Sequence, residues 1–312
     1  MDPTRKIILT GGAGLVGQNL ILTLKQKGYR RIISIDRSAA NNAVIRQLHP
    51  EVTVIDADLA EHGDWELQLE DAGALVLLQA QISGLAYSAF TRNTLQSTER
   101  VLAAARRHDV PYLVHISSSV VNSRADDYYS RSKRAQEEMV RNAGLKTAIL
   151  RPTLMFGWFD RKHLGWLARF MARVPVFPIP GDGRYIRQAL FELDFCAVIG
   201  ACLEREITGE YNISGLERVH YIELIRMIKE ASGAHTPIVR IPYRLFWLLL
   251  WTYALLDRRP PFTTQQLEAL VIPEEFEMID WPGIFGVAMT PLREALMRTF
   301  REQPYCDIVL AP

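Results

Sequence analysis

The chain has 312 residues, with 36 Lys and Arg against 35 Asp and Glu, which gives a formal net charge of +1. This balance provides no electrostatic case for a nucleic acid or an anionic membrane as the partner. Hydrophobic residues make up 48% and charged residues 23%, which excludes a mostly disordered chain. The three cysteines, Cys196, Cys202 and Cys306, form no C-x-x-C pair. We therefore expect no disulfide framework, no cysteine zinc site and a reducing, cytoplasmic compartment.

Short apolar runs alternate with helical patterns through the first half of the chain. Strands are predicted at 6–10, 31–35, 52–55, 74–78, 112–116 and 146–150, and helices at 15–28, 91–107 and 128–142. Strands that alternate with helices form a parallel sheet covered on both faces. Right-handed crossovers then give a doubly wound α/β fold.

The pattern changes after Arg151, where prolines and glycines become frequent. Helices are predicted at 163–173, 194–204, 221–231 and 291–301. We expect a smaller, mostly helical second region here. The seven histidines show no spacing typical of a metal site, so no metal is expected.

The longest apolar stretch, Leu245 to Leu256, has 12 residues. A helix that spans a membrane needs about 20, so no membrane span is expected. The stretch predicts a buried helix. A helix that lies against lipid is the alternative, which Trp247, Trp251 and Tyr253 keep open.

A glycine-rich loop follows the first predicted strand directly. Gly12, Gly14 and Gly17 satisfy G-x-G-x-x-G, and Gly11, Gly14 and Gly17 satisfy G-x-x-G-x-x-G, around Leu15 and Val16. Glycines permit the tight turn and let backbone amides approach a pyrophosphate at a helix N-terminus. Because the pattern lies between a predicted strand and a predicted helix, it indicates a dinucleotide-binding site.

Asp36 ends the second predicted strand, 19 residues after Gly17. A carboxylate there accepts the ribose hydroxyls of NAD and repels the 2′-phosphate of NADP. Arg37 follows at once and partly offsets that repulsion. The sequence therefore favours NAD.

Tyr129 and Lys133 form a Y-x-x-x-K pattern on a predicted helix. The i, i+4 spacing places both on one helix face. A nearby cation lowers the pKa of a phenol, which predicts Tyr129 as a general acid/base. Upstream, Ser117 to Ser119 end a predicted strand, where open α/β sheets bind ligands.

Together these features resemble the extended short-chain dehydrogenase/reductases, in their NAD-dependent epimerase/dehydratase branch. Further matches are Asp58-Leu59, Leu78-Gln79-Ala80, Arg151-Pro152-Thr153 with Gly157, and Gly181-Asp182-Gly183 with Arg187. The resemblance implies an NAD-binding Rossmann domain at 1–152, to which 188–212 return. It implies a substrate-binding region at 153–187 and 213–312, and a homodimer formed through helices 91–107 and 128–142.

The resemblance also implies residue roles. Tyr129 is the base, Lys133 binds the nicotinamide ribose and Ser118 orients the substrate hydroxyl. The implied cofactor-binding residues are Gly11, Gly12, Gly14, Leu15, Val16, Gly17, Asp36, Arg37, Asp58, Leu59, Leu78, Gln79, Ala80, Lys133 and Pro152. The implied substrate-binding residues are Ser118, Ser119, Leu154 and Arg187.

The chain departs from the family pattern at several positions. Leu154 stands where an asparagine often contacts a nucleotide-sugar phosphate, and Thr94 occupies an asparagine slot, with Asn93 one residue early. Because Arg187 beside the Gly-Asp-Gly loop suits a diphosphate, the expected function is an NAD-dependent epimerase or dehydratase of a nucleotide sugar. The alternatives are a dehydrogenase of an apolar alcohol, favoured by Leu154 and the 245–256 segment, and a non-catalytic NAD-bound assembly subunit.

Overall fold

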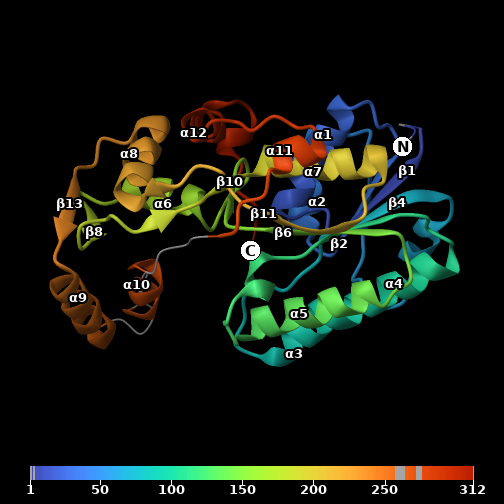
Figure 1. Ribbon diagram of the computed structural model, residues 1–312, viewed down its shortest axis with the longest axis horizontal. Helices are drawn as coiled ribbons and strands as arrows, with labels where there is room; N and C mark the ends of the chain where they lie inside the picture. Colours follow the sequence, from blue (N-terminus) through green and yellow to red (C-terminus); the bar gives the residue numbers. More distant parts are fainter. Residues whose placement is uncertain (1, 3, 257–263, 272–275, 312) are drawn as a thin grey trace.

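The computed structural model describes residues 2, 4–256, 264–271 and 276–311 (Figure 1). Within these residues, parallel strands form a seven-stranded central sheet in the order β11-β6-β5-β4-β1-β2-β3. The strands are β1 (Lys6–Thr10), β2 (Ile32–Asp36), β3 (Thr53–Asp56), β4 (Ala72–Leu77), β5 (Leu113–Ile116), β6 (Thr147–Pro152) and β11 (Gly209–Ile213). The strand order reverses where β1 lies beside β4, and ligands of doubly wound sheets bind at such a point. The predicted α/β fold is confirmed.

Helices cover both faces of the sheet (Figure 1). One face carries α1 (Leu15–Gln26), α2 (Ala39–Leu48) and α7 (Glu192–Arg205), and the other carries α3 (Tyr87–Phe90), α4 (Ser97–Arg107) and α5 (Tyr128–Arg141). Neighbouring residues of β1 enter different cores, Ile7 and Leu9 on one face and Ile8 on the other. Successive side chains of a strand point to opposite faces, which explains why a strand covered on both sides is a continuous apolar run.

Two features of this half were not predicted. Helix α2 contains Asn41 and Asn42, which are weak helix formers. The Asn42 amide offsets this by donating to the Asp36 carbonyl at 2.9 Å and to Asp56 Oδ1 at 2.7 Å. The predicted helix 91–107 is in fact a π-helical segment, Thr91–Gln96, followed by α4.

A second region lies beside the carboxyl ends of the sheet strands (Figure 1). Its strand pairs are β7 (Met155–Phe156) with β10 (Leu190–Phe191), β8 (Phe177–Pro180) with β13 (Ile238–Ile241), and β9 (Ile186–Arg187) with β12 (Val219–His220). Its helices are α6 (Leu164–Met171), α8 (Tyr221–Ser232), α9 (Tyr243–Leu256), α10 (Thr264–Val271) and α12 (Leu292–Arg301), while α11 (Trp281–Phe285) packs on α7. Short 3₁₀ segments occur at Asp64–Leu69, Ser119–Asn122 and Tyr305–Asp307. The predicted boundaries of the two regions stay predictions.

The buried helix predicted at 245–256 is wrong for the side chains that the structure describes. Leu245, Leu248, Leu249 and Trp251 are 46% to 50% exposed, whereas Phe246 is buried. The reason is position, because α9 lies at the outer edge of the second region with α10 on its inner side (Figure 1). The side chains of 253–256 lie outside the description. None of the described helices is long and apolar enough to cross a bilayer.

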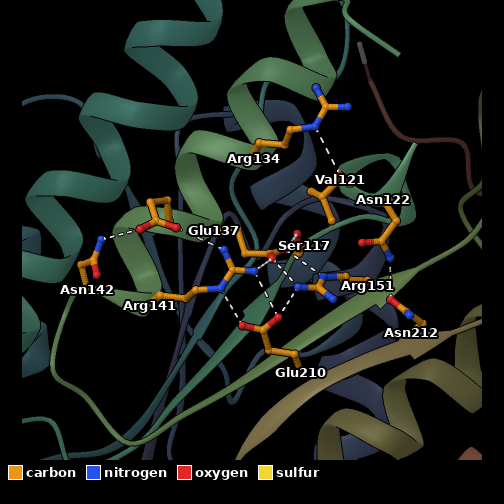
Figure 2. Close-up of polar contacts among 11 residues, drawn as sticks. Ser117, Val121, Asn122, Arg134, Glu137, Arg141, Asn142, Arg151, Glu210 and Asn212 are labelled. Carbon is orange, nitrogen blue, oxygen red and sulfur yellow. Dashed lines mark hydrogen bonds and ion pairs between the residues drawn. The ribbon is translucent and has the colours of Figure 1, made fainter. Parts of the chain in front are cut away.

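A buried ionic cluster joins α5 to the central sheet (Figure 2). Glu137 on α5 is 2% exposed and accepts from the Ser117 hydroxyl at 2.5 Å and from Arg151 Nε at 3.1 Å. Glu210 on β11 accepts from Arg141 Nε at 2.6 Å and also binds Arg151. Since Ser117 follows β5 and Arg151 belongs to β6, the cluster fixes α5 against three adjacent strands.

The cluster predicts a large stability effect of Glu137→Ala. The substitution leaves the Arg151 guanidinium, 12% exposed, without its buried carboxylate. Removing one partner of a buried ion pair costs about 3–5 kcal/mol, which we expect as the loss in free energy of unfolding by urea titration. Glu138→Ala, one residue along on the exposed side of α5, is the control and should cost less than about 1 kcal/mol. If both variants lost the same small amount of free energy of unfolding, the cluster would not stabilise the fold as proposed.

Candidate active site

A cavity of about 520 Å³ lies at the carboxyl ends of the sheet strands, where the strand order reverses. Most of the predicted site residues line it. These are Gly11, Gly14, Leu15, Val16, Gly17, Asp36, Arg37, Asp58, Leu59, Leu78, Gln79, Ala80, Ser118, Ser119, Tyr129, Pro152 and Leu154. Three predicted residues, Gly12, Lys133 and Arg187, are not among the described lining residues.

The glycine loop needs its glycines because the backbone is close-packed. Gly11 has φ +72°, and a Cβ there would lie 2.6 Å from the Gln79 nitrogen. A Cβ on Gly17 would lie 2.1 Å from the Gly12 carbonyl oxygen. Gly14 is the N-cap of α1. A glycine cap has no side chain to occupy the first N–H groups of the helix, which leaves them for an anionic group such as a pyrophosphate.

Asp36 lies at the end of β2 against this loop. Its Oδ2 accepts from the Ala13 N–H at 3.2 Å, and its Oδ1 accepts from the Ser38 N–H at 2.9 Å. Burial raises the pKa of the carboxyl, and these two hydrogen bonds act in the opposite direction. Arg37 Nη1 donates to Asn93 Oδ1 at 2.7 Å. The carboxylate is thus held beside the loop, where it suits the ribose hydroxyls of a dinucleotide.

Tyr129, and not its neighbour Tyr128, faces the cavity. The Tyr128 ring is 41% exposed and packs on Tyr87 and Phe90, with centroids 5.3 and 5.9 Å away. Burial raises the pKa of the Tyr129 phenol, and a hydrogen bond with the Ser118 side chain acts against that rise. Ser118 and Tyr129 are therefore brought together, as a proton donor and acceptor pair requires.

Lys133 is 1% exposed and turns toward the sheet. Its Nζ donates to the Ile116 carbonyl at 2.9 Å and to Gln136 Oε1 at 2.6 Å. Gln136 in turn donates to the Gln79 carbonyl at 3.1 Å. Burial lowers the pKa of Lys133 to about 7. The expected lowering of the Tyr129 pKa is wrong in this structure, because burial of the phenol outweighs the other influences on it.

Arg187 is 4% exposed and makes its contacts inside the second region. Its guanidinium carbon lies 5.1 Å from the Tyr185 ring centroid and 5.8 Å from that of Tyr221. Its side chain donates to the Ile186 carbonyl at 2.7 Å and to the Leu270 carbonyl. The role of Arg187 in binding a diphosphate stays a prediction.

Several lining residues were not predicted. They are Ala57, Ile82, Asn93, Ser97, Val120, Thr153, Met155, His163 and Phe276. Asn93 reaches the cavity from the π-helical segment, while Thr94 is buried and its hydroxyl accepts from the Gln81 N–H at 2.9 Å. The wider π turn shifts the helix register by one residue, and the asparagine one position early was the signal for it. His163 and Phe276 come from distant segments and gave no sequence signal.

Lys133 predicts a pH-dependent stability. Its pKa is 10.5 when exposed and about 7 in the fold, so between these values only the unfolded chain holds the proton. Stability rises with pH wherever the unfolded state binds more protons, by up to about 1.4 kcal/mol per pH unit for one group. The free energy of unfolding of wild type minus that of Lys133→Met should therefore increase from pH ~7 to ~10 in urea titrations. A difference that stays constant would contradict the buried, neutral lysine.

Comparison with known proteins assigns the family. Residues 7–214 match the model of the NAD dependent epimerase/dehydratase family. The chain is 26% identical to a ceramide reductase of Caulobacter vibrioides, over 77% of this chain and 75% of that protein. It is 25% identical to a 2-alkyl-3-oxoalkanoate reductase of Stenotrophomonas maltophilia, over 94% of this chain and 98% of that protein.

Solved structures agree on the fold. The crystal structure of UDP-glucuronic acid 4-epimerase from Bacillus cereus in complex with NAD has a TM-score of 0.66 and 23% identity, over 76% of this chain and 86% of that one. The glycine loop and Asp36 fit the cofactor of the matched family, so the expected NAD is confirmed. This chain belongs to the NAD dependent epimerase/dehydratase family and is an NAD-dependent enzyme of the extended short-chain dehydrogenase/reductase type.

Proposed function

We propose that this enzyme is an oxidoreductase that interconverts a ketone and a secondary alcohol on an apolar, lipid-like substrate. The observation that carries the proposal is the position of Arg187, which is buried against the stacked rings of Tyr185 and Tyr221 and bonded to backbone carbonyls. A diphosphate is held by charge-assisted hydrogen bonds. Arg187 is the residue expected from the sequence to bind the diphosphate of a nucleotide sugar, and in the structure it binds other groups instead.

The lining of the cavity supports the same substrate class. Among the described lining residues, only Arg37 and His163 have basic side chains. Arg37 donates to Asn93 beside the glycine loop, at the cofactor end. Outside the residues expected to bind the cofactor, the lining includes five apolar side chains that suit the substrate class we propose: Ile82, Val120, Leu154, Met155 and Phe276. Binding sites for apolar molecules combine such walls with a few polar groups, here Ser118 and Tyr129.

Two relatives support this choice, since by their names they reduce ceramide and 2-alkyl-3-oxoalkanoates. Both names describe molecules with long or alkyl-substituted chains. A nucleotide sugar is the second candidate, which the Gly181-Asp182-Gly183 pattern near Arg187 favours. The homodimer through α4 and α5, and the cytoplasmic location, stay predictions.

The reaction requires a proton and a hydride to move together. NAD, which the glycine loop and Asp36 would hold, would supply the hydride-transfer chemistry. Ser118 donates to the substrate oxygen and holds it next to Tyr129. In reduction the Tyr129 phenol gives its proton to that oxygen, and in oxidation the phenolate takes the proton back. Burial raises the pKa of Tyr129, so at neutral pH the phenol carries the proton that reduction requires.

The test is reduction of a long-chain 3-oxo ester by NADH, beside binding of UDP and dTDP to the NAD-loaded protein. We expect turnover of the ester and no nucleotide binding at millimolar concentration. Leu154→Asn places an amide in the apolar wall and should raise KM for the ester by about tenfold or more. Leu154→Met, of similar volume, is the control and should change KM little. Tight UDP or dTDP binding without ester reduction would favour the nucleotide-sugar alternative.

A further inference from the structure

The outer side of α9 forms an exposed apolar face that packs on no described element. We define the α9 face as Leu245, Leu248, Leu249 and Trp251, each 46% to 50% exposed. At 100° per residue these four side chains fall within an arc of about 160° of the helix. Phe246, on the opposite side, is buried. Exposed large apolar side chains that cluster on one helix side mark an interaction site.

The chain segment that carries this face has a net positive charge. From Ile238 to Leu256 the sequence contains Arg240 and Arg244 and no Asp or Glu. Both arginines are exposed. The net charge of +1 for the whole chain therefore hides a local excess of positive charge. Arg258 and Arg259 follow with Asp257 in the sequence, outside the described residues.

We propose that the α9 face docks on the surface of an anionic lipid bilayer. Leucines and a tryptophan on one helix side, with arginines at its border, are the composition of a helix that lies in the membrane interface. Arginine pairs with anionic headgroups, and tryptophan prefers the boundary between headgroups and acyl chains. With 14 residues α9 is about 21 Å long, so it lies on the bilayer and does not cross it.

The docked helix is connected to the wall of the cavity. Trp247 Nε1 donates to Glu268 on α10 at 3.4 Å, and the Leu270 carbonyl of α10 accepts from Arg187. The Phe276 N–H donates to Gln188 Oε1 at 2.7 Å, and Phe276 lines the cavity. Docking would therefore hold one cavity wall near the bilayer. The idea that an apolar substrate passes from the bilayer into the cavity rests on the proposed function. The docking of α9 on lipid does not depend on that function.

The test is co-sedimentation of the full chain with vesicles of phosphatidylcholine alone, or mixed in equal parts with phosphatidylglycerol. Wild type should sediment with the mixed vesicles, and added salt should weaken this binding. Leu248→Ser with Leu249→Ser should lower the partition coefficient by at least about tenfold, because two apolar side chains no longer enter the lipid. Arg240→Gln with Arg244→Gln should remove the preference for the anionic vesicles. Leu67→Ser, on an exposed leucine far along the chain from α9, is the control and should bind as wild type does.

Failure to sediment with either vesicle, or equal binding by the Leu248/Leu249 variant, would overturn docking. So would self-association in light scattering that the same variant abolishes, since a second copy would then cover the face. The two proposals fail separately. Vesicle binding by an enzyme that takes only nucleotide sugars leaves docking intact, and ester reduction without vesicle binding leaves the function intact.

Discussion

Two ionisable residues buried on the inner face of α5 determine the geometry on which the site depends. Lys133 is 1% and Glu137 2% exposed, and four residues separate them, so they share one helix face. A buried ionisable group must be paired or hydrogen-bonded, and the partners come from the ends of neighbouring strands, including Arg151 on β6. The helix can therefore meet the sheet in one register. That register places Tyr129, one turn before Lys133, in the cavity lining together with Ser118.

Different kinds of groups line the cavity for the cofactor and for the proposed substrate. The cofactor end is built from backbone, because the glycines let the chain turn and approach closely, and one carboxylate, Asp36, is fixed by N–H groups. The part of the cavity proposed to hold the substrate includes apolar side chains such as Leu154 and Phe276. Arg187 is buried outside the cavity lining and donates to the Leu270 carbonyl of α10, the helix beside α9. The outer face of α9 is apolar, and its chain segment is positively charged. An apolar substrate and a lipid surface are thus consistent with each other.

Features that depend on short stretches of sequence could be predicted. The six predicted strands and the glycine loop were found because periodicity, turn residues and Asp36 are local signals. Helix α2 was missed because tertiary bonds of Asn42 override its weak propensity. The exposure of α9 could not be read from its composition, since an apolar run does not say which layer covers it. The Tyr129 pKa was predicted in the wrong direction because burial outweighs what spacing to Lys133 suggests.

In the proposed reaction Tyr129 exchanges a proton with the substrate, whereas the glycine loop and Asp36 hold the cofactor. The most direct measurement is kcat for NADH-dependent ketone reduction by Tyr129→Phe, with the affinity for NADH measured on the same sample. The phenyl ring keeps the packing but has no proton to give, so we expect kcat to fall by about 10²–10⁴-fold and NADH affinity to stay unchanged. Turnover near that of wild type would show that Tyr129 is not the proton donor.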